Sequence, residues 1–164
     1  MDINKMDKEA QYIIAVRLIK YREKMISFIN EAGLQAGSFI SEKVYYSSIA
    51  DLGKGAVIFP NAMVTGNPKV GDYLFMDVFS IISHGDVMGN NIVIGPAAVI
   101  TGDCIIGDNV TFGVNSALLP GTRIGSNTEI AVNTFPGRNI PQNSRILSKP
   151  GKNFGKGLNK NFKK

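Results

Sequence analysis

The sequence predicts an all-β fold, a parallel β-helix of hexapeptide repeats that follows a short strand–helix unit and precedes a basic tail. The first observation is that every sixth residue from Leu52 to Ile130, fourteen in a row, is large and apolar. In a chain that is 44% hydrophobic, such a run has a chance of about 10⁻⁵. The second observation is that glycine often follows these residues, and that the fourth position after them is mostly small or β-branched.

The six-residue period excludes an α-helix, whose period is about 3.6 residues, and a strand alternation, whose period is about two. Three hexapeptides, each a short strand and a corner, make one coil of 18 residues, so residues 52–130 are expected to wind about four and a half times. The apolar residue points inward, and glycine is expected to ease the corner backbone. Cys104 lies in an inward column, so we expect a core residue rather than a nucleophile.

Three segments follow from this pattern. In residues 1–48, Tyr12–Val16 is typical of a strand, and residues 17–33 are typical of an amphipathic helix with Leu18, Met25 and Ile29 on one face and Gly33 as its stop signal. Residues 49–141 are expected to form the β-helix. After Pro136 the repeat is lost, and residues 142–164 are expected to be an irregular basic tail.

The net charge of +5 belongs to the tail and not to the body of the chain. From Arg145 onward there are seven basic residues and no acidic one, which leaves eleven basic against thirteen acidic residues elsewhere. We therefore expect no nucleic-acid partner; the tail is either a solvated end or attracts phosphates. No apolar segment reaches the roughly 18–20 residues that a membrane span needs. With Cys104 as the single cysteine, a cytoplasmic location is expected.

One corner column carries the candidate chemistry. Gly66, His84, Gly102, Pro120 and Arg138 are each 18 residues apart and are expected to stack on one outer edge, with about 4.8 Å between coils. His84 is the only histidine and is expected to project outward. Either it is a surface imidazole without a role, or it is a general base for acyl transfer. In the second case the Gly102 N–H, one coil away, stabilises the thioester oxygen as it gains charge.

A resemblance to a known family lies in the H-x-x-x-x-G-x₁₂-G pattern of His84, Gly89 and Gly102, within SIISHGDVMGNNIVIGPAAVITGDCIIGDNVTFGVNSALLPGTRIG. From about Ile49 to Lys152 the sequence resembles the bacterial sialic acid O-acetyltransferases and amino-sugar N-acetyltransferases. The resemblance implies a left-handed β-helix, a homotrimer, acetyl-CoA in the groove between subunits and His84 as general base. It implies that the Gly102 N–H binds the acetyl carbonyl. The other residues expected to bind acetyl-CoA are Pro120, Arg138 and, near its phosphates, Lys152.

Two departures from this family affect the site. Its members usually follow the histidine with Asp or Glu, whereas here Gly85 follows and the carboxylate comes one residue later. Asp86 is therefore expected either to turn inward and hold the imidazole, as the second catalytic residue, or to be a turn residue. Asp77 matches the position that contacts the sugar acceptor in the family; the alternative is a solvated corner aspartate. The second departure is that residues 1–48 keep only the last strand and helix of the family's nucleotide-sugar subdomain, without a glycine-rich phosphate loop.

The function expected from these features is acetyl transfer from acetyl-CoA to a hydroxyl or amine of a sugar, in surface polysaccharide or glycan synthesis. The alternative is a non-sugar small acceptor, such as an amino acid or an antibiotic, because the same base and oxyanion donor serve both. A zinc-dependent β-helix enzyme needs three histidines and the chain has one, so no metal is expected. The choice between O- and N-acetylation, and the acceptor itself, stay open.

Overall fold

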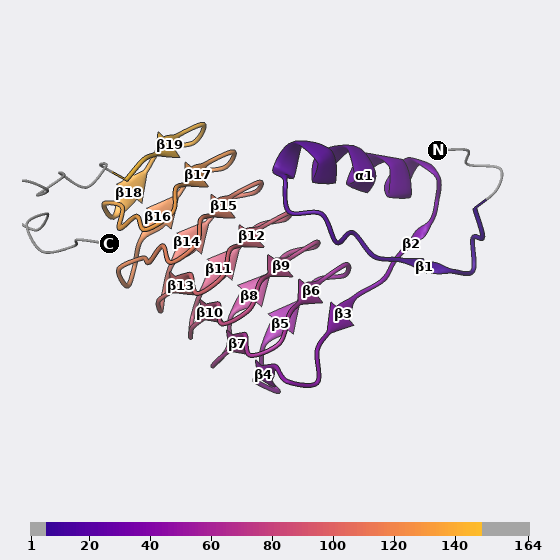
Figure 1. Cartoon of the computed structure of the whole chain (residues 1–164), viewed down its shortest axis with the longest axis horizontal. Coiled ribbons are helices and arrows are strands. Elements are labelled where there is room, and N and C mark those ends of the chain that lie inside the picture. Colours follow the sequence, from indigo (N-terminus) through magenta and orange to yellow (C-terminus); the bar gives the residue numbers. More distant parts are fainter. Residues whose placement is uncertain (1–5, 149–164) are drawn as a thin grey trace, which may run out of the picture.

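A computed structural model describes residues 6–148, and it consists mostly of a left-handed parallel β-helix (Figure 1). Each strand is only two residues long. From β3 on, successive strands along the chain belong to different sheets, and each pairs in parallel with the strand one coil away. The expected fold class is therefore confirmed.

The strands β3 to β19 form three sheets that run along the β-helix. The first sheet contains β4 (Tyr45–Tyr46), β7 (Met63–Val64), β10 (Ile81–Ile82) and β13 (Val99–Ile100). The second contains β5 (Asp51–Leu52), β8 (Lys69–Val70), β11 (Val87–Met88), β14 (Ile105–Ile106), β16 (Arg123–Ile124) and β18 (Asn139–Ile140). The third contains β3 (Phe39–Ile40), β6 (Val57–Ile58), β9 (Phe75–Met76), β12 (Val93–Ile94), β15 (Thr111–Phe112), β17 (Glu129–Ile130) and β19 (Arg145–Ile146).

The core of the β-helix is the column of repeated apolar residues. From Ile58 to Ile130 every sixth side chain is buried, and Leu52, in the first strand of its sheet, is half-buried and packs against them. The column four residues on also points inward, and Cys104 is fully buried there as expected. Stacking each coil on its neighbours therefore buries one continuous ladder of apolar side chains.

The glycines after the inward residues serve a different purpose from the one expected. None of them has a positive φ, so they do not ease the corner by backbone freedom. A Cβ at Gly71 would instead lie 2.9 Å from the carbonyl oxygen of Gly89, and one at Gly113 would lie 2.5 Å from the amide nitrogen of Val132. These glycines are needed because neighbouring coils approach closely.

Among the described residues other than glycine, asparagine provides seven of the eleven left-handed conformations. Asparagine tolerates a positive φ better than most residues, and its amide groups here bond from coil to coil. Nδ2 of Asn91 donates to Oδ1 of Asn109 at 2.9 Å, Asn109 donates to Asn127, and Asn127 donates to Asn143. We call this run the asparagine ladder. The asparagines with positive φ are Asn61, Asn91, Asn109, Asn115, Asn127, Asn133 and Asn143.

The N-terminal unit differs from the expectation in two ways. Its strand β1 (Gln11–Tyr12) is shorter than Tyr12–Val16 and pairs with β2 (Gln35–Ala36). The helix α1 (Ile19–Glu31) ends close to Gly33, which has φ +63°. The predicted apolar face of the helix is only partly buried. Ile29 is buried, whereas Leu18 is 64% exposed and Met25 is 38% exposed.

Arg22 is the side chain that joins α1 to the β-helix. It is fully buried, and its guanidinium donates to the carbonyl oxygens of Ile14, Val16 and Tyr73 and, through Nε, to Oδ1 of Asn91 at 2.7 Å. Burial lowers the pKa of Arg22 to about 10. Tyr73 and Asn91 belong to the β-helix, so these two bonds hold α1 beside it (Figure 1).

The sheets extend beyond the expected range 49–141. β3 pairs with β6 and β4 pairs with β7 before residue 49, and β19 pairs with β17 after residue 141. The six-residue repeat is lost at Pro136 because the last coil is shorter. In it the strand partners Arg123 and Asn139, and Glu129 and Arg145, are 16 residues apart, against 18 in the earlier coils. In the part of the chain from residue 6 to 148, no helix is both long and apolar enough to cross a membrane.

Candidate active site

The expected corner stack of His84 is present. His84 lies two residues after β10, with its side chain exposed, between two glycines of the neighbouring coils. A Cβ at Gly66 would lie 2.6 Å from the Cβ of His84, and one at Gly102 would lie 2.6 Å from Nε2 and 2.8 Å from Nδ1 of the ring. The imidazole therefore packs against the backbone of Gly102, and both glycines make room for the histidine.

In the described part of the chain, the carbonyl oxygen of Gly102 is hydrogen-bonded within the β-helix, whereas its N–H is not. Its carbonyl oxygen accepts a hydrogen bond from the N–H of Gly121 at 3.0 Å. Within residues 6–148, no hydrogen bond has the Gly102 N–H as its donor. An N–H next to an exposed imidazole can bind an oxygen that gains negative charge during a reaction.

Pro120 and Arg138 continue the column as expected. Nη1 of Arg138 donates to the carbonyl oxygen of Pro120 at 2.9 Å, across one coil. The backbone of Arg138 is also held, since its carbonyl oxygen accepts from the N–H of Arg123 at 2.7 Å. The coil therefore continues past Pro136 and places a cation two coils from Gly102. Lys152 lies outside the described residues.

Asp86 turns into the core, as expected, but its oxygens bond to backbone N–H groups and not to the His84 imidazole that it was expected to hold. It is fully buried, and its oxygens accept hydrogen bonds from the N–H of Ser83 at 3.1 Å and of Cys104 at 2.9 Å. Burial raises the pKa of Asp86 to about 6; the two backbone N–H groups and His84 act to lower it, and Asp103 acts to raise it. Within residues 6–148, no hydrogen bond or ion pair joins the His84 ring to a carboxylate.

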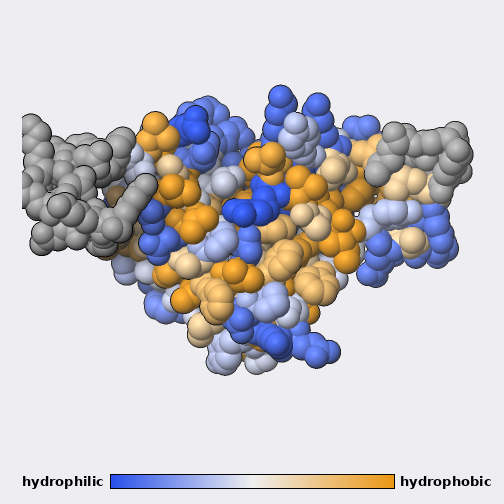
Figure 2. Space-filling view, in the orientation of Figure 1, coloured by the Kyte–Doolittle hydropathy of each residue, from blue (hydrophilic) through white to orange (hydrophobic). Residues whose placement is uncertain are grey.

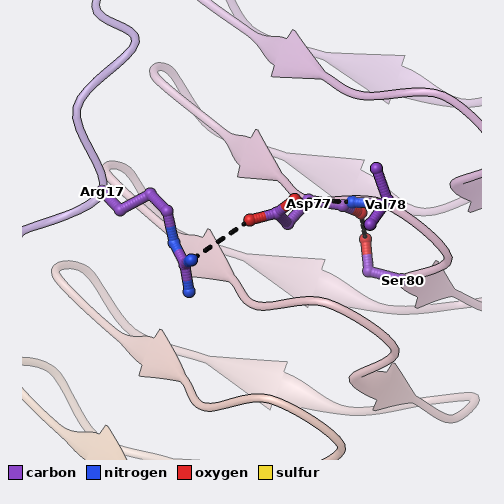
Figure 3. A network of polar contacts seen from close by, with 4 residues as sticks. All are labelled: Arg17, Asp77, Val78 and Ser80. Atoms are coloured by element: carbon purple, nitrogen blue, oxygen red, sulfur yellow. Dashed lines mark hydrogen bonds and ion pairs between the residues drawn. The ribbon is translucent and has the colours of Figure 1, made fainter.

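Asp77 lies at another corner, directly after β9. Its Oδ2 pairs with Nη1 of Arg17 at 3.3 Å, and its Oδ1 accepts from the N–H of Val78 at 2.8 Å (Figure 3). Its carbonyl oxygen accepts from the hydroxyl of Ser80 at 2.6 Å. Asp77 is thus ion-paired and its side chain is 16% exposed, which differs from a solvated corner aspartate. Arg17 was missed because nothing in the hexapeptide pattern relates it to residue 77.

Cys104 is a buried thiol and not an exposed nucleophile. Its Sγ donates to the carbonyl oxygen of Thr101 at 3.0 Å, and burial raises its pKa. Such a thiol is mostly protonated at neutral pH and is unreactive. Among the residues that the structure describes, no group of three or more histidine, cysteine or acidic side chains is arranged to hold a metal ion.

Two open clefts lie between α1 and the β-helix, and neither is at His84. One, of about 530 Å³, is lined by residues that include Arg17, Glu129 and Arg145. The other, of about 500 Å³, is lined by residues that include Asn30 and Asp108. In a single chain, His84 therefore lies at an open corner, away from both clefts.

Comparison with known proteins identifies the fold. No protein-family model matches the sequence, and no curated protein sequence matches it. The acetyltransferase domain of PglB from Neisseria gonorrhoeae, solved with acetyl coenzyme A, has a TM-score of 0.84 at 20% identity, over 92% of this chain and 74% of that one. The chain has the fold of an acetyltransferase.

Two further solved structures share this fold. WeeI from Acinetobacter baumannii has a TM-score of 0.84 at 22% identity, over 90% of this chain and 72% of that one. A mutant of perosamine N-acetyltransferase from Caulobacter crescentus, solved with CoA and GDP-perosamine, has a TM-score of 0.81 at 20% identity. That match covers 87% of this chain and 68% of that one.

Proposed function

We propose that this protein transfers an acetyl group from acetyl-CoA to a hydroxyl or amine of a sugar, in surface polysaccharide or glycan synthesis. The observation that carries the proposal is the contact between the His84 ring and Gly102, whose N–H is not a donor within residues 6–148. The shared fold supports it, because PglB was solved with acetyl coenzyme A and the Caulobacter enzyme with CoA and GDP-perosamine.

The two residues match the two needs of acetyl transfer. His84 takes the proton of the acceptor hydroxyl or amine, which then forms a bond to the acetyl carbon. The Gly102 N–H donates to the carbonyl oxygen as negative charge develops on it. Acetyl-CoA supplies the acetyl group; its C–S bond breaks, and the proton held by His84 leaves with the CoA sulfur. Pro120, Arg138 and Lys152 are the residues proposed to contact CoA.

The proposal includes a homotrimer. The outer face of the sheet formed by β4, β7, β10 and β13 presents one apolar side chain from each coil. Tyr45 is 62% exposed and Met63 is 38% exposed, although both are large and apolar. The face seen in Figure 2 is instead a mosaic of hydrophobic and hydrophilic residues. A continuous apolar stripe on a flat sheet favours association. The stripe consists of Tyr45, Met63, Ile81, Val99 and Ala117.

The stripe also connects the trimer to the site. His84 lies two residues after β10, so it borders the same sheet. A second copy on this face would cover the open corner of His84 and create a groove for acetyl-CoA between subunits. Asp77, held by Arg17, is the residue proposed to meet the acceptor from a neighbouring copy. The free thiol of Cys104 fits a reducing, cytoplasmic location.

The decisive experiment is a thiol-release assay with acetyl-CoA against nucleotide sugars, free amino sugars, polysaccharide, amino acids and aminoglycosides. Release that depends on an amino sugar or a sugar hydroxyl supports the proposal, and mass spectrometry of the product distinguishes O- from N-acetylation. Release with amino acids or antibiotics alone would instead support the non-sugar acceptor. The absence of both CoA binding and thiol release would contradict acetyl transfer altogether.

A further inference from the structure

Asp86 is an unexpected residue for its position. Its column points into the core, and the neighbouring members are Ser80, Ile92, Ala98 and Cys104, none of which is charged. Placing a carboxylate among them costs free energy unless its oxygens are hydrogen-bonded. Both oxygens of Asp86 are bonded, and both of their partners are backbone N–H groups close to the site.

The bond to Oδ1 of Asp86 connects the turn that contains Gly102 to the preceding coil. At several other corners the N–H of this column donates to the carbonyl oxygen three residues earlier, as from Thr122 to Leu119 and from Ala98 to Gly95, both at 3.2 Å. Ala56 is an exception, because its N–H donates to Oγ of Ser38 in the preceding coil at 3.0 Å. The N–H of Cys104 donates instead to Oδ1 of Asp86 in the preceding coil at 2.9 Å. The thiol of Cys104 takes over the carbonyl oxygen of Thr101 that this leaves free.

The other bond closes the turn that carries His84. One coil earlier, the equivalent N–H, of Thr65, donates to the carbonyl oxygen of Ile82 in the next coil at 2.9 Å. The N–H of Ser83 donates instead to Oδ2 of Asp86 at 3.1 Å. Each bond to Asp86 therefore stands where the regular coil has a bond between two backbone groups, and both replacements occur beside His84 and Gly102.

We propose that Asp86 is a positioning residue that sets the spacing between the His84 turn and the Gly102 turn, with one carboxylate oxygen bound to each. This inference rests on the proposed function, since the spacing matters only if His84 and the Gly102 N–H act on the same acetyl group. Asp86 then acts through the backbone and not by holding the imidazole. The N–H of Asp103, which donates to the carbonyl oxygen of His84 at 3.0 Å, provides a second tie between the same coils.

The spacing is important because acyl transfer needs the base and the oxyanion donor within a narrow range of positions. A displacement of about 1 Å in an active site costs on the order of 100-fold in rate. A hydrogen bond between two backbone groups moves with the coils that contain them. A short carboxylate that is bonded to both turns instead holds the distance between the two turns constant. The effect is expected in kcat rather than in the affinity for CoA.

The test compares Asp86→Ser and Asp86→Asn with Ser116→Ala in the full-length protein. Serine is chosen because the same column already contains Ser80 and Ser116, both buried, so the fold accommodates it there. Its hydroxyl is too short to reach both turns. Ser116→Ala is the matched control, because it removes one buried hydrogen bond, to the carbonyl oxygen of Gly113, at a different corner.

The measurements are kcat and KM for acetyl-CoA, the Kd for CoA and the thermal unfolding midpoint. We expect Asp86→Ser to lower kcat by tenfold or more, about 10–100-fold, with KM and Kd within a factor of about two and without a lower midpoint at pH 7.5, because the buried charge is gone. Asp86→Asn should lower kcat in the same direction, and Ser116→Ala should leave it unchanged.

Two results would overturn the role of Asp86. One is a kcat within about twofold of wild type in both Asp86 variants. The other is a loss of rate that matches the unfolded fraction in both, which would make Asp86 a purely structural residue. A wild-type chain that binds no CoA and releases no thiol would overturn the proposed function as well, so the failure of one is distinguishable from the failure of the other.

Discussion

Arg22 donates a hydrogen bond from Nε to Oδ1 of Asn91 at 2.7 Å and thereby closes the first end of the asparagine ladder. In the ladder each side-chain amide donates to the next coil, so Oδ1 of Asn91 is the acceptor that the ladder itself does not use. The Arg22 guanidinium thus connects the helix to the hydrogen-bonding system of the coils. This guanidinium has no acidic partner among the groups it bonds, which are carbonyl and amide oxygens.

Replacing Arg22 with methionine should lower the free energy of unfolding of the protein by about 3 kcal/mol or more, because buried carbonyl oxygens lose their donor. The N-terminal unit should become accessible to protease before the β-helix does, as followed by limited proteolysis and mass spectrometry. Arg145→Met is the matched control: Arg145 pairs with Glu129 on the surface, and a pair of this kind contributes about 1 kcal/mol or less. Equal protease resistance of wild type and Arg22→Met would contradict this role of Arg22.

Gly102→Ala should lower kcat about 100-fold while the protein stays folded. The added Cβ would meet the His84 ring, and the exposed ring can only move away from its position over the Gly102 backbone. Gly137→Ala is the control, since a Cβ there has no neighbour within 4 Å. Steady-state thiol release and circular dichroism measure the two quantities. Full activity of Gly102→Ala would exclude a contact-dependent role for this pair.

The free energy of unfolding of the protein should depend on pH between about pH 4 and 6 because of Asp86. Its folded-state pKa is raised from 3.8 to about 6, chiefly by burial, so the folded state binds a proton more tightly than the unfolded state. The resulting stabilisation is fully present below pH 3.8 and is lost as the pH rises through about 6. Relative to Asp86→Ser, wild type should therefore lose about 2 kcal/mol of unfolding free energy from pH 4 to pH 7.

Urea unfolding at several pH values measures this difference. His84 lowers and Asp103 raises the pKa of Asp86, so Asp103→Asn should move the window to lower pH. A wild-type protein whose stability relative to Asp86→Ser is constant across the window would show that Asp86 keeps its ordinary pKa.

Ile81→Glu, in the apolar stripe, should convert the proposed trimer to monomers and abolish most of the activity. A charge on this flat face would be buried between copies without a partner. Val87→Glu is the control, because Val87 is 49% exposed on the neighbouring sheet, in a column that also contains Lys69 and Arg123. Light scattering coupled to size-exclusion chromatography reports the mass. A trimeric Ile81→Glu protein would place the interface elsewhere.

The repeating part of this fold could be predicted from the sequence because one rule, a six-residue period, determines both burial and register. Because Ile82 and Ile100 are partners in neighbouring strands, His84 is expected to stack on Gly102, and the structure contains that contact. The inward direction of Asp86 follows in the same way. Residues 18 apart meet in space, so a long-range contact in the β-helix reduces to counting along the chain.

The parts that escaped prediction are those where no period relates the partners. Arg22 reaches Asn91 and Arg17 reaches Asp77 from a segment outside the repeats. The glycines after the inward residues were expected to allow unusual backbone angles at the corners. Sequence alone does not distinguish a glycine that is needed for a positive φ from one that is needed because a Cβ would clash with the next coil. The last coil was missed because its 16-residue length removes the sixth-residue match at Pro136.

The coil-to-coil hydrogen bonds restrict how a chain of this kind can change in length. Asp72, Asn90, Asp108 and Ser126 bond in succession, each to the residue 18 positions away. Removing a single residue from a middle coil would shift that coil against the next one and break the register of these hydrogen bonds. Removing a complete coil would instead bring together two coils with the same register. The shortened final coil is tolerated because none of the described strands stacks beyond it. Within the β-helix, the viable unit of insertion or deletion is therefore the complete coil, and lineages of this fold should differ in length by multiples of it.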